Sequence, residues 1–379
     1  MKTYRIHMAL LLCVALVSGS CTQETTPEMP SSPKIGTLSG TGTTNTLEEI
    51  PAVQRGDMHE ISSSWMKYVN DAALLRDLTI VGTHDAGASV ATGSWASLRP
   101  SKTQYGSISE QLNSGVRYLD IRIDWWPGYN KFYVYHGTIY QHKELESDVL
   151  RPIQNFLAAN PTETVFITFK KENDGDRDEW ARELQRTLAK YKEIIAPNWG
   201  STTTIGAVRG KMLAITRDIE VEGAAFLTGI GNNKVTPSAF LYTPQAEGTY
   251  QRSAIYYTDD YKSSKSVKIE NLKQAIELSN VPSSGELQLS EHWFITGANL
   301  AGLNPYGYAS TVNDALQQML SQKVSTGIQQ TQIPQRIGGI LLIDYALDTP
   351  GLKILDIAMY HTLLVHNTAY REREVTLRR

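Results

Sequence analysis

The stretch Leu78-Thr-Ile-Val-Gly-Thr-His-Asp-Ala-Gly-Ala-Ser89 indicates the fold and holds the first candidate site residues. Residues 78–81 favour β structure and predict a short buried strand. The strand ends at Gly82, and His84 and Asp85 follow, at the place where α/β barrels keep their catalytic groups. Histidine titrates near neutral pH, and a neighbouring carboxylate adds a second proton-handling group. The pair alone also fits an ordinary surface loop, so its meaning depends on the strands downstream.

Downstream of this stretch, β-favouring runs alternate with amphipathic helical segments. Strands are predicted over residues 116–123, 132–135, 164–169, 211–216, 255–257, 293–296 and 340–344, and helices over 107–115, 146–159, 178–195, 269–278, 315–322 and 352–365. Such alternation is typical of a parallel sheet with crossover helices, and about eight strands favour a closed barrel over an open sheet. Residues 219–250 fit no helix, and we expect them to form a long excursion from the barrel. No glycine fingerprint of a dinucleotide or P-loop site follows any of these strands.

The charge balance excludes one class of partner. The chain of 379 residues has 36 Lys and Arg against 39 Asp and Glu. This near-neutral balance has no basic excess of the kind that indicates nucleic-acid binding, so we expect no nucleic-acid partner.

The N-terminus has the pattern of a secretory signal. Lys2 and Arg5 precede an apolar run over residues 8–17, which is too short to cross a membrane as a helix. Small residues lead into Cys21, as in the lipobox of bacterial lipoproteins, although Ser18 replaces the usual aliphatic residue. The chain has 2 cysteines, both in this segment, so cleavage at Cys21 would leave it no disulfide partner and favours a lipid anchor. Ordinary signal cleavage, giving a secreted protein, stays open as the alternative.

The composition then divides the chain into three parts. Residues after Cys21 are rich in Thr, Ser and Pro and nearly free of aromatic side chains, so they cannot bury enough apolar surface to order themselves. We predict a lipoprotein-type signal over residues 1–20, a flexible tether over 21–55 and a single barrel domain over 56–379. The protein is expected to be exported and anchored to a bacterial membrane.

Polar side chains accumulate where the predicted strands end. Asp120, Arg122 and Asp124 share one face of their strand because their spacing is two, and His136 follows the next strand. Later strands end in Lys170-Lys171-Glu172, Arg217-Asp218, Asp259-Asp260-Tyr261 and Asp344-Tyr345. Two histidines can act as base and acid, carboxylates can orient them, and arginine can hold phosphate oxygens. We therefore predict phosphoryl chemistry. Since the sequence has no His-x-x-x-His and the predicted barrel has no cysteine, we expect no metal and no cofactor.

Five motifs carry a resemblance to a known family. Gly82-Thr-His-Asp-Ala-Gly87, Asp120-Ile-Arg122, Tyr135-His-Gly137, Phe169-Lys-Lys-Glu172 and Ile343-Asp-Tyr345 resemble bacterial phosphatidylinositol-specific phospholipase C. The similarity runs from about Leu78 to the end of the last helix. It implies an α/β fold, a single distorted (βα)8 TIM-like barrel with parallel strands, and we expect a monomer.

The resemblance also implies catalytic roles. His84, held by Asp344, would take the proton from the inositol 2-hydroxyl. Arg122, supported by Asp120, would stabilise the phosphate oxygens. This arginine stands where the calcium-dependent subgroup has a carboxylate that helps to hold the ion, which implies the metal-independent form.

His136, paired with Asp85, would protonate the departing diacylglycerol oxygen. The products would be diacylglycerol and inositol 1,2-cyclic phosphate, which makes the enzyme formally a lyase. Asp124 is expected to be a structural ion-pair partner.

Binding residues carry over in the same way. The matches to the inositol-contacting residues of the family are Lys170, Arg217, Asp259 and Tyr261, and the residues expected at a membrane-facing rim are Trp95, Leu303, Tyr306 and Tyr308. The substrate would be phosphatidylinositol or a glycosylated phosphatidylinositol in a membrane.

Two other functions stay open. A related barrel phosphodiesterase, such as a glycerophosphodiesterase, would fit the fold, but it usually holds a divalent ion with a Glu-x-Asp motif that this sequence lacks at the expected strand end. A surface-anchored lipoprotein that binds inositol or glycan without turnover would not need both histidines and both partner carboxylates.

Overall fold

The computed structural model describes residues 58–89, 101–230, 236–280, 292–302, 304–330 and 332–371. Its strands are β1 (Ile80–Thr83), β2 (Tyr118–Trp126), β3 (Lys131–His136), β4 (Ile139–Glu144), β5 (Thr164–Lys171), β6 (Lys211–Arg217), β7 (Ala225–Thr228), β8 (Thr236–Pro244), β9 (Tyr250–Thr258), β10 (Trp293–Gly297) and β11 (Ile340–Ile343). Its main helices are α2 (Ile108–Asn113), α3 (Arg151–Ala159), α4 (Arg177–Ala189), α5 (Lys265–Ser279), α6 (Pro305–Gln329) and α7 (Thr349–His366). The predicted signal and tether, with Cys21, lie outside these residues.

The strands form one sheet that closes on itself. Within the described residues the order is β1-β11-β10-β9-β8-β7-β6-β5-β2-β3-β4, and β1 also pairs with β2, which completes the ring. The predicted closed barrel is therefore confirmed. The neighbours in the ring are parallel except on the two sides of β8, which pairs antiparallel with β7 and β9. Beyond the ring, β3 and β4 continue as an antiparallel extension of β2.

The expected excursion over residues 219–250 was wrong. This segment supplies β7 and β8, which are part of the barrel wall. In β8 the side chains of Ala239 and Leu241 are buried, and Phe240 between them is partly exposed, which is the alternation of a strand with one face toward a core. Among the described residues no α-helix separates β7 from β8 or β8 from β9, so the alternation of strands and helices does not reveal them.

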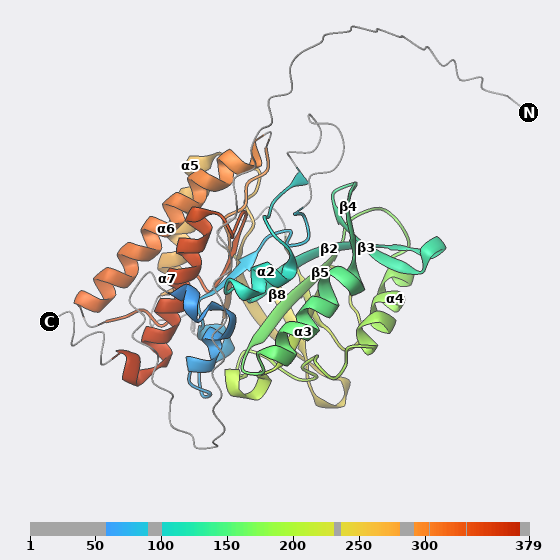
Figure 1. Cartoon of the computed structure of the whole chain (residues 1–379), viewed down its shortest axis with the longest axis horizontal. Helices are drawn as coiled ribbons and strands as arrows, with labels where there is room; N and C mark the ends of the chain where they lie inside the picture. The colour runs from blue at the N-terminus through green and yellow to red at the C-terminus, as the bar shows by residue number, and fades with distance from the viewer. Residues whose placement is uncertain are drawn as a thin grey trace, which may run out of the picture. The chain divides into compact units, whose positions relative to one another are not determined.

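The helices cover the outside of the barrel. Figure 1 shows α5, α6 and α7 side by side along one flank and α3 and α4 on another. The helix predicted to start at residue 107 is confirmed as α2, with Ser107 as its N-cap. Ser107 accepts a hydrogen bond from the Glu110 amide, and the Glu110 carboxylate accepts one from the Ser107 amide. None of the described helices is long and apolar enough to cross a bilayer.

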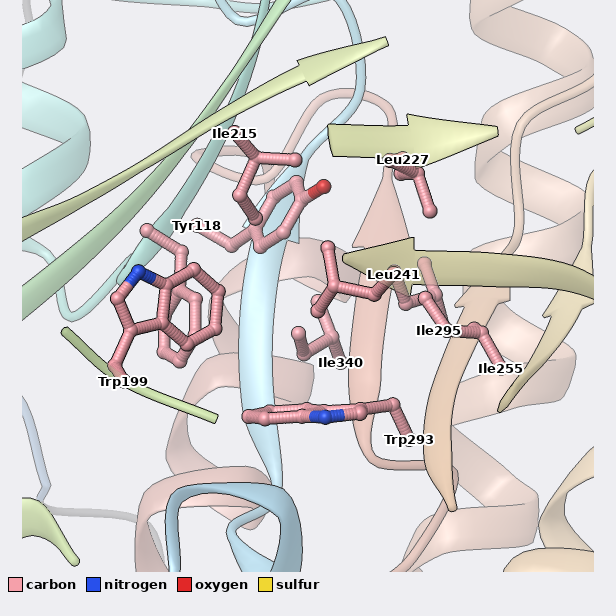
Figure 2. Close-up of a pocket in the computed structure, with 10 residues that line it drawn as sticks. Tyr118, Trp199, Ile215, Leu227, Leu241, Ile255, Trp293, Ile295 and Ile340 are labelled. Carbon is pink, nitrogen blue, oxygen red and sulfur yellow. The ribbon is translucent and has the colours of Figure 1, made fainter. Parts of the chain in front are cut away.

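The interior of the barrel is packed with apolar side chains. Figure 2 shows residues from most strands of the ring pointing into one space, which holds a cavity of about 10 Å³. Near the amino ends of the strands, the rings of Trp199 and Trp293 pack edge to face with centroids 6.1 Å apart. This interior leaves no room for a ligand, so polar chemistry is confined to the carboxyl ends of the strands.

Candidate active site

The site lies where neighbouring strands end. His84 follows β1, Asp344 follows β11, and the two strands are parallel neighbours with Thr83 opposite Ile343. On the other side of β1, the register of β2, β5 and β6 places Arg122, Lys170 and Arg217 in one cross-strand row. Like charges in adjacent strands repel, so such a row needs carboxylates or an anionic ligand beside it.

His84 and Asp344 form a partly shielded pair. His84 Nδ1 lies 2.8 Å from Asp344 Oδ1. Burial lowers the pKa of His84, but the charge and hydrogen bond of Asp344 outweigh that effect and raise the pKa above its usual value. The carboxylate therefore holds the ring in the tautomer that carries hydrogen on Nδ1, which leaves Nε2 as the hydrogen-bond acceptor of the ring.

Arg122 connects the charged groups of the site. Its Nη2 donates to His84 Nε2 at 2.6 Å, and its Nη1 lies 3.2 Å from Asp85 Oδ2 and 3.3 Å from Glu172 Oε1. Its Nε lies 3.6 Å from Asp120 Oδ2. These carboxylates raise the pKa of Arg122 despite its burial, so the guanidinium stays charged. It thus covers Nε2 of His84.

Asp85 links this arginine to the second histidine. His136 Nε2 lies 3.2 Å from Asp85 Oδ2, the same oxygen that contacts Arg122. Asp85 has a left-handed backbone, with φ of 48°, and its amide donates to Asp120 Oδ2 at 3.2 Å. Burial raises the pKa of Asp85, and the charges of Arg122 and His136 offset part of that rise. The two histidines thus converge on one arginine through a shared carboxylate.

Asp120 is held in its charged form. Burial raises its pKa, but the charges of Arg122, His84 and Arg217 outweigh this and hold the pKa below the usual range. Its contacts with Arg122 and with the Asp85 amide agree with the supporting role expected from the sequence. Asp124, two residues farther along β2, instead pairs with Lys171 at 2.8 Å and is the structural ion pair that was predicted.

Glu172 is a site residue that was not among the predicted ones. Its carboxylate contacts Arg122 and accepts from Lys170 Nζ at 2.6 Å and from the Gly137 amide at 2.8 Å. The charges of Arg122 and Lys170 outweigh burial and hold its pKa below the usual value. A signal was present in the sequence, because the spacing of two puts Lys170 and Glu172 on the same side of the chain at a strand end.

The predicted ring-binding residues gather beside this cluster. Arg217 Nη2 lies 3.4 Å from Asp259 Oδ2, and Asn299 Nδ2 lies 3.4 Å from Asp259 Oδ1. Asn299 follows β10 and was not predicted. Tyr261 shares the turn with Asp259, because its amide donates to the Asp259 carbonyl at 2.8 Å, and it is half-buried.

Comparison with known proteins shows what the chain is similar to. Residues 84–214 match the model of the phosphatidylinositol-specific phospholipase C X domain. Over these residues the chain is similar to that domain. A 1-phosphatidylinositol phosphodiesterase of Staphylococcus aureus (strain Newman) is 25% identical over 297 residues, which cover 75% of this chain and 88% of that protein. The enzyme of the same name from Listeria monocytogenes is 31% identical over 163 residues, or 41% of this chain and 49% of that protein.

Solved structures agree on the fold. A phosphatidylinositol-specific phospholipase C mutant from Staphylococcus aureus has a TM-score of 0.60 and 22% identity, and covers 78% of this chain and 96% of that chain. The Listeria monocytogenes enzyme gives 0.58 and 23%, with coverages of 79% and 98%. The X-domain match includes His84, Arg122 and His136. Asp259 and Asp344 lie after the last matched residue, and the closure of the barrel brings them close to the matched site residues.

The predicted membrane rim is only partly described. Trp95 and Leu303 lie outside the described residues. Tyr306 is 44% exposed and donates to Asp348 at 2.8 Å, whereas Tyr308 is half-buried against the core. Exposure of Tyr308 was therefore overestimated, because the first turn of α6 directs it inward.

The described structure adds further exposed hydrophobic residues to this rim. The large hydrophobic residues that are exposed in the described part of the chain are Tyr105, Trp126, Tyr129, Val267, Tyr306 and Leu352. Every one lies in a segment at or after the carboxyl end of a strand, the end of the barrel that holds the site. Trp126 and Tyr129, at the tip of the β2–β3 hairpin, were not predicted. Exposed aromatic side chains gathered on one face are typical of an interaction surface.

Proposed function

We propose that this protein is a metal-independent phosphatidylinositol-specific phospholipase C, which cleaves phosphatidylinositol into diacylglycerol and inositol 1,2-cyclic phosphate. The observation that carries the proposal is the continuous chain of contacts Asp344–His84–Arg122–Asp85–His136. It supplies a base, an acid and a cation between them, which is what an internal phosphoryl transfer needs.

His84 acts as the base. With Nδ1 held by Asp344, its Nε2 takes the proton of the inositol 2-hydroxyl, and the 2-oxygen forms a bond to phosphorus. Arg122 turns from Nε2 toward the non-bridging phosphate oxygens and donates to them as charge develops. The guanidinium fork matches two oxygens at once, and this geometry does electrostatic work that a divalent ion does in other phosphodiesterases.

His136 acts as the acid. Its imidazolium, paired with Asp85, gives its proton to the glycerol oxygen while the bond from that oxygen to phosphorus breaks. His84 ends the step protonated and His136 neutral. The same groups in reversed roles activate a water on the cyclic ester, so hydrolysis of that product is a second and slower reaction.

The cations and Asp259 hold the substrate. Arg122, Lys170 and Arg217 stand in one row, so a phosphate beside them relieves their mutual repulsion. Asp259 accepts hydrogen bonds from ring hydroxyls, and Tyr261 offers a face for the ring. The site takes an inositol phosphate of a membrane lipid, free or glycosylated.

The membrane is the second partner. Exposed aromatic residues on the face that holds the site provide the contact, with Trp126, Tyr129 and Tyr306 among them. Tyrosine and tryptophan suit the interface because their rings are apolar and their tips polar. The enzyme works as a monomer, exported and held to a bacterial membrane through a lipid on Cys21.

The experiment that tests this function is ³¹P NMR of phosphatidylinositol micelles incubated with the protein and EDTA. We expect the signal of a five-membered cyclic phosphate first and that of inositol 1-phosphate later. Product that requires added calcium would contradict the role of Arg122. If no product forms with or without calcium, but inositol lipids bind saturably, the protein is a binding lipoprotein and not an enzyme. If it cleaves only glycerophosphodiesters, it is another phosphodiesterase.

A further inference from the structure

The base and its partner carboxylate lie on two neighbouring turns. His84 and Asp344 each follow the last residue of a strand, and each is followed by a residue with left-handed backbone, Asp85 with φ of 48° and Tyr345 with φ of 52°. Such turns interrupt the ladder of main-chain hydrogen bonds between the strands. The buried carbonyl and amide groups of both turns therefore need partners from elsewhere.

A segment before α2 supplies these partners. Thr103 Oγ1 donates to the Asp85 carbonyl at 3.0 Å, and the Thr103 carbonyl accepts from the Tyr345 amide at 2.7 Å. The Lys102 carbonyl accepts from the Tyr345 hydroxyl at 2.5 Å. We call residues 102–104 the strap, because it crosses the turns after β1 and β11 and bonds to both.

Gln104 makes the closest connection between the two turns. Its Nε2 donates to the His84 carbonyl and to the Ile343 carbonyl, both at 2.9 Å, and its Oε1 accepts from the Ala346 amide at 3.1 Å. The residue is fully buried. Both side-chain N–H groups and the side-chain oxygen are used, and only one orientation of the amide satisfies all three contacts.

We propose that Gln104 is a positioning residue, which fixes the separation and orientation of His84 and Asp344 by tying their main chains together. The inference rests on the proposed function, because it concerns the base of that reaction. One amide bonds to the His84 carbonyl, to the carbonyl before Asp344 and to the amide two residues after Asp344. These bonds fix the main-chain positions from which the His84 and Asp344 side chains extend. A displacement of about 1 Å at a reacting group can lower the rate about a hundredfold.

The role predicts a definite kinetic change. In Gln104→Met the volume is kept and the three hydrogen bonds are lost, so Asp344 holds His84 less well. We expect kcat to fall about ten- to hundredfold. KM stays unchanged, because the residues proposed to bind the substrate, Lys170, Arg217 and Asp259, lie on or directly after other strands than β1 and β11.

The pH profile moves in a direction that a general loss of stability would not produce. Asp344 raises the pKa of His84 against the effect of burial. A loosened pair lowers that pKa, so the free base persists to lower pH. The acid limb of the profile of Gln104→Met therefore shifts to lower pH while the plateau falls.

Asn367→Leu is the matched control. Asn367 is also a buried amide that uses both ends, since it donates to the Tyr68 carbonyl at 2.9 Å and accepts from the Tyr370 amide at 3.0 Å. It lies at the far end of α7, roughly 27 Å along the helix from the turn after β11. This variant should lose thermal stability to a similar extent and keep the kcat and pH profile of the wild type.

The test is the pH dependence of kcat and KM for phosphatidylinositol cleavage in both variants, with melting temperatures. A lowered kcat with a shifted acid limb in Gln104→Met, and neither in Asn367→Leu, supports the proposal. An unshifted limb, or equal losses in both variants, overturns it. If Gln104→Met does not fold, Thr103→Val removes the hydrogen bonds from the Thr103 hydroxyl to the Asp85 and Ala88 carbonyls. This variant should lower kcat severalfold at unchanged KM, and wild-type kinetics would overturn the role of the strap. An inactive wild type would instead defeat the proposed function.

Discussion

At the scale of single residues, the geometry of Arg122 matters more than its charge. Its guanidinium contacts a histidine nitrogen and three carboxylates, and these contacts come from all of its nitrogen atoms. A lysine has one ammonium and cannot make a planar fork, so the same charge would not serve the same partners.

Arg122→Lys should therefore lower kcat by about 10² to 10³, the range found when a preorganised donor to a developing oxyanion is removed. The measurement is phosphatidylinositol cleavage in EDTA and again with calcium. Arg186→Lys is the control, since Arg186 is an exposed arginine with one carboxylate partner and should tolerate the change. Activity within about threefold of wild type in Arg122→Lys would contradict the role of the guanidinium fork.

The two histidines can be told apart by the leaving group. A general acid matters only when the departing oxygen is strongly basic, so an inositol phosphate with a nitrophenol leaving group does not need one. We expect His136→Ala to cleave the nitrophenyl substrate nearly as well as wild type and to fail on phosphatidylinositol. His84→Ala should fail on both. Equal losses on both substrates in His136→Ala would mean that this residue is not the acid.

At the scale of elements, the β2–β3 hairpin carries both residues of the site and exposed aromatic residues. The β2–β3 hairpin carries Arg122 in its first strand and His136 at the end of its second. Glu172 ties the end of β3 to the barrel through the Gly137 amide. The tip holds Trp126 and Tyr129, which are 45% and 67% exposed. An element that contacts the membrane and also carries the acid would align the lipid phosphate with it.

Replacing Trp126 and Tyr129 by serine should weaken binding to phosphatidylinositol vesicles by about tenfold, since two exposed rings are lost from the contact. Sedimentation with vesicles measures the binding. Cleavage of a water-soluble inositol phosphate ester is the control and should be unchanged, because the catalytic contacts remain. Unchanged vesicle binding would exclude the hairpin tip from the membrane contact.

The sequence predicted site residues best where charged side chains directly follow a β-favouring run. His84 and Asp344 were found at strand ends, because the parallel strands β1 and β11 bring their carboxyl ends together. His136 reaches the site in another way, since β3 runs antiparallel to β2 outside the ring. Boundaries were less accurate, and α6 covers Pro305–Gln329 where only residues 315–322 were predicted. Gln104 was missed, because it acts on main-chain groups, and such contacts leave no spacing pattern. Glu172 was passed over as one charge among several at a strand end.

At the scale of the whole molecule, the barrel separates stability from chemistry. Apolar side chains fill its interior, and the charged groups of the site stand at one end. The predicted barrel was confirmed, but β7 and β8 could not be recognised, because the described residues around them hold no crossover α-helix. One buried histidine outside the site makes the fold itself sensitive to acid.

That residue is His361 on α7, whose ring lies 3.0 Å from Thr79 Oγ1 and 2.8 Å from the Pro334 carbonyl. Burial lowers its pKa to about 3. The folded state therefore holds it neutral, while the unfolded chain protonates it below its usual pKa of about 6.5. Its contribution to stability is present above about pH 6.5 and is lost as the pH falls toward 3, by roughly 3 kcal/mol at pH 4.5.

His361→Gln should flatten this dependence, since glutamine can bond to both partners and does not titrate. Urea unfolding at pH 7 and pH 4.5 measures it, with exposed His59→Gln as the control. An equal loss of stability in wild type and His361→Gln between the two pH values would show that other groups cause the acid sensitivity.

The most direct test of the account is the initial rate of diacylglycerol release from phosphatidylinositol in EDTA, measured for wild type, His84→Ala and the matched control His142→Ala. His142 stands on β4 beside the ring of Tyr140 and outside the contact chain of the site. We predict turnover by wild type and His142→Ala and none by His84→Ala. Turnover that survives in His84→Ala, or that wild type shows only when calcium replaces EDTA, would contradict catalysis by the His84–Arg122–His136 cluster.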